Sequence, residues 1–125
     1  MNQELQQKLF DKYPLLFAQH DLDMKETCMC WGIETGDGWF DLIDTLCKTI
    51  QSYITLNHKP QVEFVQVKEK FGTLRVYTAG GDDIIHGMIW FAESLSGTIC
   101  EVCGKPGHCN ESGWIRCRCD EHQID

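Results

Sequence analysis

Positive charge is scarce in this sequence. Its 11 lysine and arginine residues are outnumbered by 19 aspartate and glutamate residues, which gives a formal net charge of −8. Non-specific binding to nucleic acid requires a surplus of cations that displaces counterions from the phosphates, so the composition excludes that function. The one locally basic segment is 60–81, which contains Lys68, Lys70 and Arg75 and two acidic residues. Such a segment is suited to a small anionic ligand.

Long hydrophobic runs, prolines and repeats are also scarce or missing. No segment reaches the roughly 18 apolar residues of a transmembrane helix, and the first residues lack the basic and apolar regions of a secretory signal. The sequence therefore predicts no membrane contact and a place in the reducing cytoplasm. Only three prolines interrupt the 125 residues, of which 42 % are hydrophobic. This length and composition indicate a single globular domain, 1–125.

Cysteine, in contrast, is abundant in the last quarter of the chain. Cys100 and Cys103 form a C-x-x-C pair followed by glycine, and Cys119 and His122 form a second pair after 15 intervening residues. Two such pairs supply four ligands at spacings that a tetrahedral zinc ion accepts. Because protein groups take all four positions, we expect a structural zinc and not a catalytic one.

The spacing alone leaves other ligand sets open. Cys117 can replace Cys119, and His108 or Cys109 can substitute for another ligand. In a reducing compartment we expect thiols at the five cysteines outside the predicted site: Cys28, Cys30, Cys47, Cys109 and Cys117. The first three of these, together with His20, are candidates for a second metal site, although cysteine is more often a small buried apolar side chain.

Helical periodicity marks three segments. The first covers residues 3–12. The second covers 38–56, where apolar side chains recur every three or four residues and Asp37 is the expected N-cap. The third follows an N-cap at Asp82 or Asp83, and its expected inner face consists of Ile84, Ile85, Met88, Ile89, Ala92 and Leu95.

A loop and two strands complete the body. Residues 18–36 lack periodicity and are expected to form a loop. Alternating apolar residues predict strands over 61–68 and 73–78, and an intervening glycine favours an antiparallel hairpin. The order helix, helix, hairpin, helix predicts an α+β fold, with helices packed on a small antiparallel sheet. Residues 1–99 would form the body of this domain, and residues 100–125 its zinc-binding tail.

Two clusters in the body suggest binding sites. Four carboxylates within 11 residues are a candidate site for a hard metal ion or a solvated helix start: Glu34, Asp37, Asp41 and Asp44. Aromatic and basic residues around the hairpin are a candidate pocket for a nucleotide or another phosphorylated ligand: Trp39, Lys68, Lys70, Phe71, Arg75 and Tyr77. A simpler interpretation of the second cluster is an edge hairpin whose charges prevent aggregation.

Five short motifs run through the chain: MCWGIE at 29–34, GDGW at 36–39, VKEKFGTLR at 67–75, CEVCG at 100–104 and GWIR at 113–116. Together they resemble a family of small phage and prophage proteins with a C-terminal zinc knuckle. The typical pattern of that family has a residue other than cysteine at position 117, which favours Cys119 and His122 as the second ligand pair. The resemblance implies a phage-encoded protein in a bacterial cytoplasm and implies no activity.

The functional prediction is therefore a non-enzymatic accessory protein that binds a host protein, for example an inhibitor of an anti-phage system. One alternative is a protein that sequesters a nucleotide or another phosphorylated small molecule through the basic segment. A second alternative is a metal-dependent enzyme that uses the carboxylates near the second helix.

Overall fold

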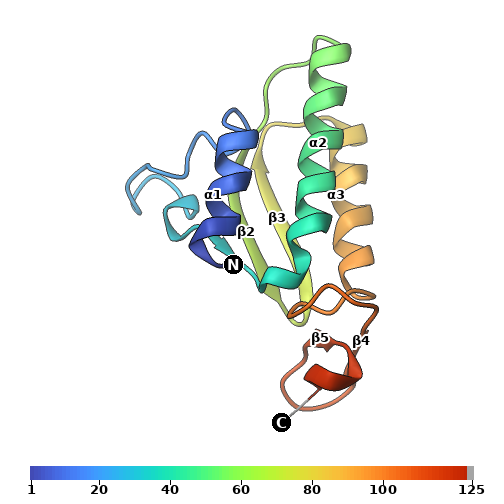
Figure 1. Ribbon diagram of the computed structural model, residues 1–125. Helices are drawn as coiled ribbons and strands as arrows, with labels where there is room; N and C mark the ends of the chain where they lie inside the picture. The colour runs from blue at the N-terminus through green and yellow to red at the C-terminus, as the bar shows by residue number, and fades with distance from the viewer. Residues whose placement is uncertain (124–125) are drawn as a thin grey trace.

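The computed structural model describes residues 1–123 and confirms the mixed α+β fold (Figure 1). Its helices are α1 (Gln3–Lys12), α2 (Phe40–Leu56) and α3 (Asp83–Ser96). A three-stranded sheet has the order β1-β2-β3, with strands β1 (Ile33–Glu34), β2 (Glu63–Lys70) and β3 (Thr73–Ala79). A second, two-stranded sheet in the tail consists of β4 (His108–Cys109) and β5 (Cys117–Arg118). Within the described residues, no helix has the length and apolar character to span a membrane.

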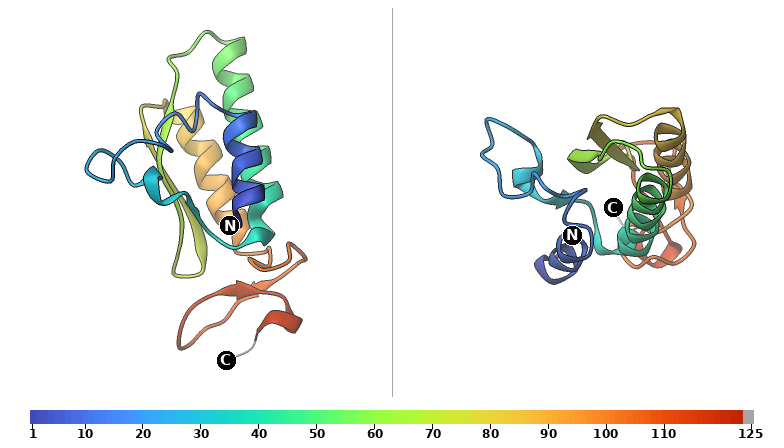
Figure 2. Two further views of the ribbon diagram at one scale, coloured as in Figure 1. Left: turned by 60° about the vertical axis from the view of Figure 1, so that its left-hand side comes forward. Right: turned by 90° about the horizontal axis from the view of Figure 1, so that it is seen from above.

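One hydrophobic core lies between the three-stranded sheet and the helices, which line one side of the sheet in the view from above (Figure 2). Side chains alternate between the two faces of a strand. In the β2–β3 hairpin, Val67, Leu74 and Val76 are therefore buried, whereas Lys68 and Arg75 lie on the opposite face. The largest fully buried side chains come from the N-terminal segment, the start of α2 and the sheet: Trp39, Phe17, Phe64, Leu9, Leu16 and Met29.

The β2–β3 hairpin is antiparallel, as predicted, and its turn is tighter than the sequence suggested. β2 continues to Lys70, which pairs with Thr73, so only two residues connect the strands. Both have positive φ, 53° at Phe71 and 87° at Gly72. A two-residue turn of this kind matches the twist of the strands and places Phe71 at the tip of the hairpin.

The predicted loop 18–36 contains a strand that the sequence does not reveal. β1 runs parallel to β2, with Ile33 opposite Val67. Its outer edge is covered, because Ile33 N donates to Gln6 Oε1 at 2.8 Å and Ile33 O accepts from the amino group of Met1 at 3.0 Å. Two residues are too few for a detectable alternating pattern, so pairing and not periodicity defines this strand.

Helix α3 covers the other edge of the sheet. Leu74 N donates to Ser96 Oγ, and Val76 N donates to Glu93 Oε2, both at 2.9 Å. Polar side chains of α3 thus occupy backbone donors that could otherwise pair with another chain. Asp82 is the N-cap of α3, since its side chain accepts from Ile85 N at 3.0 Å. The expected inner face is wrong at Ile84 and at Leu95, both of which are exposed.

The N-cap predicted for α2 is wrong. The helix begins at Phe40, after a 3-10 turn over Asp37–Trp39, and has no side-chain cap. The Asp37 carboxylate instead accepts from Asn2 N at 2.7 Å and from Asn2 Nδ2 at 3.0 Å. Asn2 is itself the N-cap of α1, because its side chain accepts from Leu5 N at 2.8 Å. Asp37 therefore connects the starts of two helices.

Asp44 joins α1 to α2, and this contact predicts a pH effect. Its Oδ1 accepts from Lys12 Nζ at 2.9 Å and from Tyr13 Oη at 2.7 Å. Burial raises the pKa of Asp44, but the hydrogen bonds from Lys12 and Tyr13 outweigh it and leave the pKa below its ordinary value. The stabilisation is therefore present above the ordinary carboxyl pKa of about 4 and is lost as the pH falls through the lower pKa of the folded state.

We expect Asp44→Asn to lower the free energy of unfolding by about 1 kcal/mol at pH 7. The difference from the unmodified protein should shrink as the pH falls below the ordinary carboxyl pKa and then through the lower pKa of the folded state, because the carboxyl group becomes protonated. Urea unfolding at pH 7, 5 and 3 measures this difference. Asp11→Asn is the matched control, since Asp11 is exposed and its carboxylate accepts a hydrogen bond from Gln7 Nε2 on the same helix. A pH-independent loss in Asp44→Asn would contradict an electrostatic role.

Candidate metal centre

Four side chains of the tail converge as the sequence predicts. One ligand atom from each of Cys100, Cys103, Cys119 and His122 lies within 4.8 Å of the other three, which is close enough for one metal ion. The Cys103 and Cys119 sulfurs are 3.7 Å apart, and His122 Nδ1 is 3.1 Å from Cys119 Sγ and 3.5 Å from Cys100 Sγ. The arrangement is that of a metal centre made entirely of protein ligands.

Local backbone geometry positions the two ligand pairs. Gly104 N donates to Cys100 O at 2.9 Å, closing the turn that carries Cys100 and Cys103, and Gly104 has a φ of 83°. His122 N donates to Cys119 O at 3.0 Å in the 3-10 turn at the end of the described chain. Burial raises the pKa of Cys100, but backbone N–H groups, that of Cys119 first, donate to its sulfur and lower the pKa to about 6. The backbone is thus arranged to stabilise a thiolate, the form that binds a metal.

The metal centre is docked on the start of α2. Glu101 Oε2 accepts from Gly36 N, and Glu101 O accepts from Gly38 N, each at 2.8 Å. Trp39 Nε1 donates to Ile99 O at 3.0 Å. The Glu101 carboxyl group lies between the tail and the body, and this burial raises its pKa. The tail is therefore hydrogen-bonded to the body along its first residues.

Two glycines make this close approach possible, and the sequence reasoning did not recognise their role. A Cβ at Gly36 would collide with the carbonyl group of Glu101. A Cβ at Gly38 would collide with Cys100 O and lie 2.6 Å from Gly104 N. The sequence feature that could have indicated this role is the spacing Gly36-x-Gly38 immediately before an apolar helix. Such a pair of glycines is typical of a turn where two backbones come into contact.

The expectation that Cys109 and Cys117 are thiols is wrong. They are direct partners in the β4–β5 ladder, and the structure joins them by a disulfide. Neither belongs to the converging group, and His108 is exposed, with its Nδ1 3.9 Å from Asp120 Oδ1. The alternative ligands left open by the spacing, Cys117, Cys109 and His108, are therefore not part of the converging group.

This pairing predicts which cysteines control metal content. Cys109→Ala with Cys117→Ala should leave one metal ion per chain, because the double variant removes only the link between β4 and β5. Cys119→Ala should abolish stoichiometric binding. Elemental analysis of the purified chains, or their mass under native conditions, distinguishes the two results. Loss of metal in the double variant alone would contradict the ligand assignment.

The other candidate metal sites do not assemble among the described residues. Cys28 is exposed, Cys30 Sγ donates to Thr27 O at 3.4 Å, and Cys47 is buried in the core, where desolvation raises its pKa. His20 stacks on Phe10 with a centroid distance of 4.4 Å. The four carboxylates do not converge either: Glu34, Asp37, Asp41 and Asp44. Within residues 1–123, the side chains close enough to share a metal ion are Cys100, Cys103, Cys119 and His122.

The residues proposed for an anion pocket are divided by the fold. Lys68 pairs with Arg75 across the hairpin, and the strand alternation places Lys70 and Tyr77 on the same face as this pair. Trp39 is a correction, because its side chain is completely buried and cannot contribute to a surface pocket. Phe71 is at the hairpin tip, beside a cavity of 470 Å³ that is also lined by Lys68, Lys70 and Trp114. Arg75 and Tyr77 do not line this cavity.

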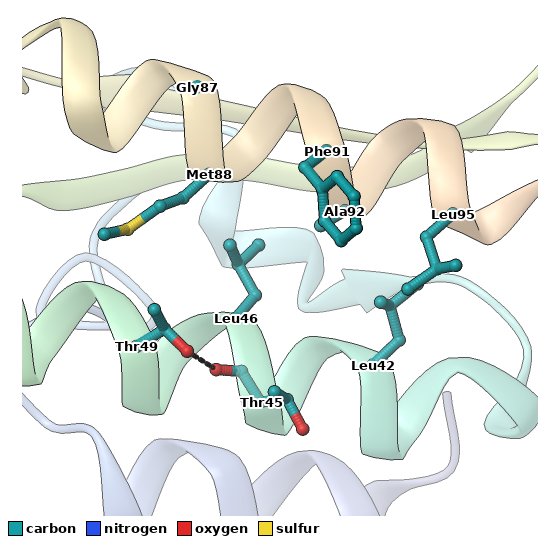
Figure 3. A pocket seen from close by; sticks show the side chains of 9 residues that line it. All are labelled: Leu42, Thr45, Leu46, Thr49, Gly87, Met88, Phe91, Ala92 and Leu95. Carbon is teal, nitrogen blue, oxygen red and sulfur yellow. Dashed lines mark hydrogen bonds between the residues drawn. The ribbon is translucent and has the colours of Figure 1, made fainter.

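A second cavity, of 440 Å³, is an apolar groove between α2 and α3 (Figure 3). Its walls are formed by Leu42, Thr45, Leu46, Thr49, Gly87, Met88, Phe91, Ala92 and Leu95. Phe91 and its neighbour Trp90 are 70 % and 73 % exposed. The apolar periodicity of both helices predicts a core face, but periodicity alone does not separate a core face from a groove.

Fold and site together define an α+β domain with a docked group of three cysteines and one histidine that is close enough to hold a metal ion. No model of a known family, no curated protein and no solved structure matches the chain.

Proposed function

We propose that the chain is a zinc-stabilised, non-enzymatic binding protein whose α2–α3 groove receives a helix of a partner protein. The observation that carries this proposal is the exposed apolar surface of α3 beside the groove. The zinc holds the tail in place and takes no part in a reaction. The partner helix covers the apolar surface of α3 that is exposed in the chain alone.

The ligand set supports zinc. Three thiolates and one imidazole are typical ligands of structural zinc sites. Ligands about 2.3 Å from a central ion are roughly 3.7 Å apart at the corners of a tetrahedron. The separations of 3.7, 3.5 and 3.1 Å among the four side chains are close to this value. With four protein ligands, no position remains for water or a substrate, which supports a structural role.

The surface of α3 supports protein binding. Ile84, Trp90, Phe91 and Leu95 are all exposed on this one helix. Monomeric proteins rarely expose contiguous apolar patches of this kind, and such patches commonly mark interaction sites. Gly87, the first residue of α3 that lines the groove, has no heavy atom within 4 Å of the position of an added Cβ. Its small size therefore serves no packing within the chain and leaves room for an approaching backbone.

Charge and shape favour an amphipathic helix with basic flanks as the partner segment. The groove runs between α2 and α3, which are antiparallel (Figure 1), and a third helix can lay its apolar stripe between two such helices. The segment 82–99 contains three acidic residues and no basic residue, in a chain of net charge −8. Asp41, one turn before Thr45, adds negative charge at the start of α2. Basic residues beside the apolar stripe of the partner complement these charges.

The resemblance of the sequence to phage and prophage proteins supports a partner from the bacterial host. A small protein that occupies a helix-binding surface can act by blocking an assembly of host proteins, for example in an anti-phage system. This activity requires no catalytic residue, in agreement with a closed metal centre.

A photo-crosslinking residue at position 49, inside the groove, tests the proposal in bacterial lysate. The matched control is position 55, which lies on α2 but lines a different cavity, beside Lys12 and Tyr13. We expect a crosslink from position 49 only, to an amphipathic, basic helical peptide identified by mass spectrometry. The synthetic peptide should bind the intact protein, and Phe91→Asp should weaken that binding at least tenfold.

Two results would contradict the proposal. A crosslink from position 49 to a second copy of the chain would assign the groove to self-association. A crosslink from position 49 to an acidic or extended peptide would contradict the proposal of a basic, helical partner segment.

A further inference from the structure

A second surface, where the β2–β3 hairpin meets the tail, has the composition of a small-molecule site. The 470 Å³ cavity lies between the tip of the β2–β3 hairpin and residues 113–115 of the tail. Its volume is within the range of ligand sites, about 300 to 1,000 Å³. Phe71 and Trp114, 43 positions apart in the sequence, line it together and are 70 % and 80 % exposed. The fold thus brings two uncovered aromatic rings to one cavity.

We propose that this cavity binds a nucleotide, with the base on the Phe71 and Trp114 rings and the phosphate at Lys68 and Lys70. Aromatic side chains bind bases by stacking, and lysine ammonium groups bind phosphate as point charges. This inference is independent of the α2–α3 groove, which lies on different elements. It also differs from the pocket expected from the sequence, because Trp114 takes the place of Trp39, and Arg75 and Tyr77 are outside the cavity.

The charges at the cavity favour an anion. Lys68 and Lys70 line it, and no ion pair occupies either of them in the described part of the chain. Lys70 Nζ lies 5.6 Å from the centroid of the Phe71 ring, so the positive charge and the ring belong to one surface. Glu69 also lines the cavity, but its carboxylate accepts from Gly72 N at 2.7 Å within the turn. A positively charged lining on a protein of net charge −8 is a local feature of this cavity.

The wall that carries Trp114 is held in place before any ligand binds. Asn110 Nδ2 donates to Trp114 O at 2.8 Å, and Arg116 N donates to Asn110 Oδ1 at 2.7 Å. The Cys109–Cys117 disulfide closes the base of the same loop. The loop also touches the hairpin, since a Cβ at Gly72 would lie 3.1 Å from Ile115 Cγ2. A preformed cavity loses less conformational entropy when a ligand binds.

Titration of the intact, metal-loaded protein with AMP, followed by the four tryptophan indole N–H resonances in NMR, tests the inference. We expect AMP to shift the Trp114 resonance and to leave the resonance of the buried Trp39 unchanged, which also shows that the fold is intact. Adenosine should bind roughly tenfold more weakly, because it lacks the phosphate, and inorganic phosphate should not shift Trp114. Trp114→Phe identifies the resonance.

Variants separate the ring contribution from the charge contribution. Trp114→Ser should weaken AMP binding by about tenfold or more, in keeping with the effect of losing a stacked ring. Lys68→Met with Lys70→Met should weaken binding of AMP but not of adenosine. Trp90→Ser is the matched control, because it removes an equally exposed tryptophan from α3 and should leave AMP binding unchanged.

Three results would overturn the inference. Absence of a Trp114 shift with millimolar AMP would show that the cavity does not bind nucleotides. Equal affinities for AMP and adenosine would remove the role of the lysines. Tighter binding of a 5′-phosphorylated oligonucleotide than of AMP would replace a mononucleotide cavity by a nucleic-acid surface. None of these results bears on the helix proposed for the α2–α3 groove.

Discussion

Removal of the metal is expected to lower the thermal unfolding midpoint by roughly 10 °C or more and to release the tail from the body. Over residues 100–123, the tail has no apolar core of its own, because its buried side chains there are the cysteines Cys100, Cys117 and Cys119. Its two strands have two residues each, and such short strands do not form a stable sheet alone. Besides the Cys109–Cys117 disulfide and the hydrogen bonds to the body, we expect metal binding to supply the free energy that holds residues 100–123 together.

The experiment compares thermal unfolding before and after treatment with a chelator, followed by re-addition of zinc. Cys103→Ser should reproduce the metal-free result, since it removes one ligand at the surface. Cys28→Ser is the matched control, because Cys28 is exposed and lies outside the converging group. An unfolding midpoint that does not change on complete removal of the metal would contradict a structural role.

Gly38→Ala is expected to lower the free energy of unfolding by about 2 to 3 kcal/mol. The added methyl group would collide with backbone atoms, Cys100 O and Gly104 N, which cannot rotate away as a flexible side chain can. The collision separates the metal centre from the start of α2 and breaks the hydrogen bond from Gly38 N to Glu101 O. We expect a loss of stability with metal still bound, because the four ligands remain.

Gly87→Ala is the opposite case and serves as the control. Gly87 lies within α3, and no atom lies within 4 Å of the position of its added Cβ. Alanine has the higher helix propensity, so this variant should be more stable by about 1 kcal/mol. Denaturant unfolding of both variants with metal bound measures the two effects. Equal effects of the two substitutions would contradict the close backbone contact at Gly38.

Much of the fold was predictable because local chemistry decided it. The helix over 3–12 and the antiparallel hairpin follow from spacing and from a glycine that permits positive φ. Helix α2 starts two residues later than predicted, because a 3-10 turn precedes it and the Asp37 carboxylate accepts a hydrogen bond from Asn2 N instead of capping the helix. Asn2 is 35 positions away from Asp37 in the sequence, and the local sequence gives no sign of such a distant contact.

The side chains of the candidate sites were less predictable than the elements that carry them. Trp39 lies in the 3-10 turn before α2, where its side chain is buried, as the periodicity predicted, so that its assignment to a surface pocket is wrong. Trp114 had no recognisable role in the sequence, because the cavity that it lines exists only where the tail meets the hairpin. The exposed face of α3 had the same spacing as a core face, so its lack of a covering layer appears only in three dimensions.

By itself, the sequence determined the class of the fold and predicted the four residues that converge in the tail, although the spacing left other ligand sets open. Both depend on short-range spacing: 3.6 residues per helical turn, alternation along a strand, and two residues between paired ligands. The tertiary structure alone decided that Cys109 pairs with Cys117, that Gly36 and Gly38 seat the metal centre, and which apolar surfaces stay uncovered. These features join segments far apart in the chain, and such contacts are set by the packing of the whole domain.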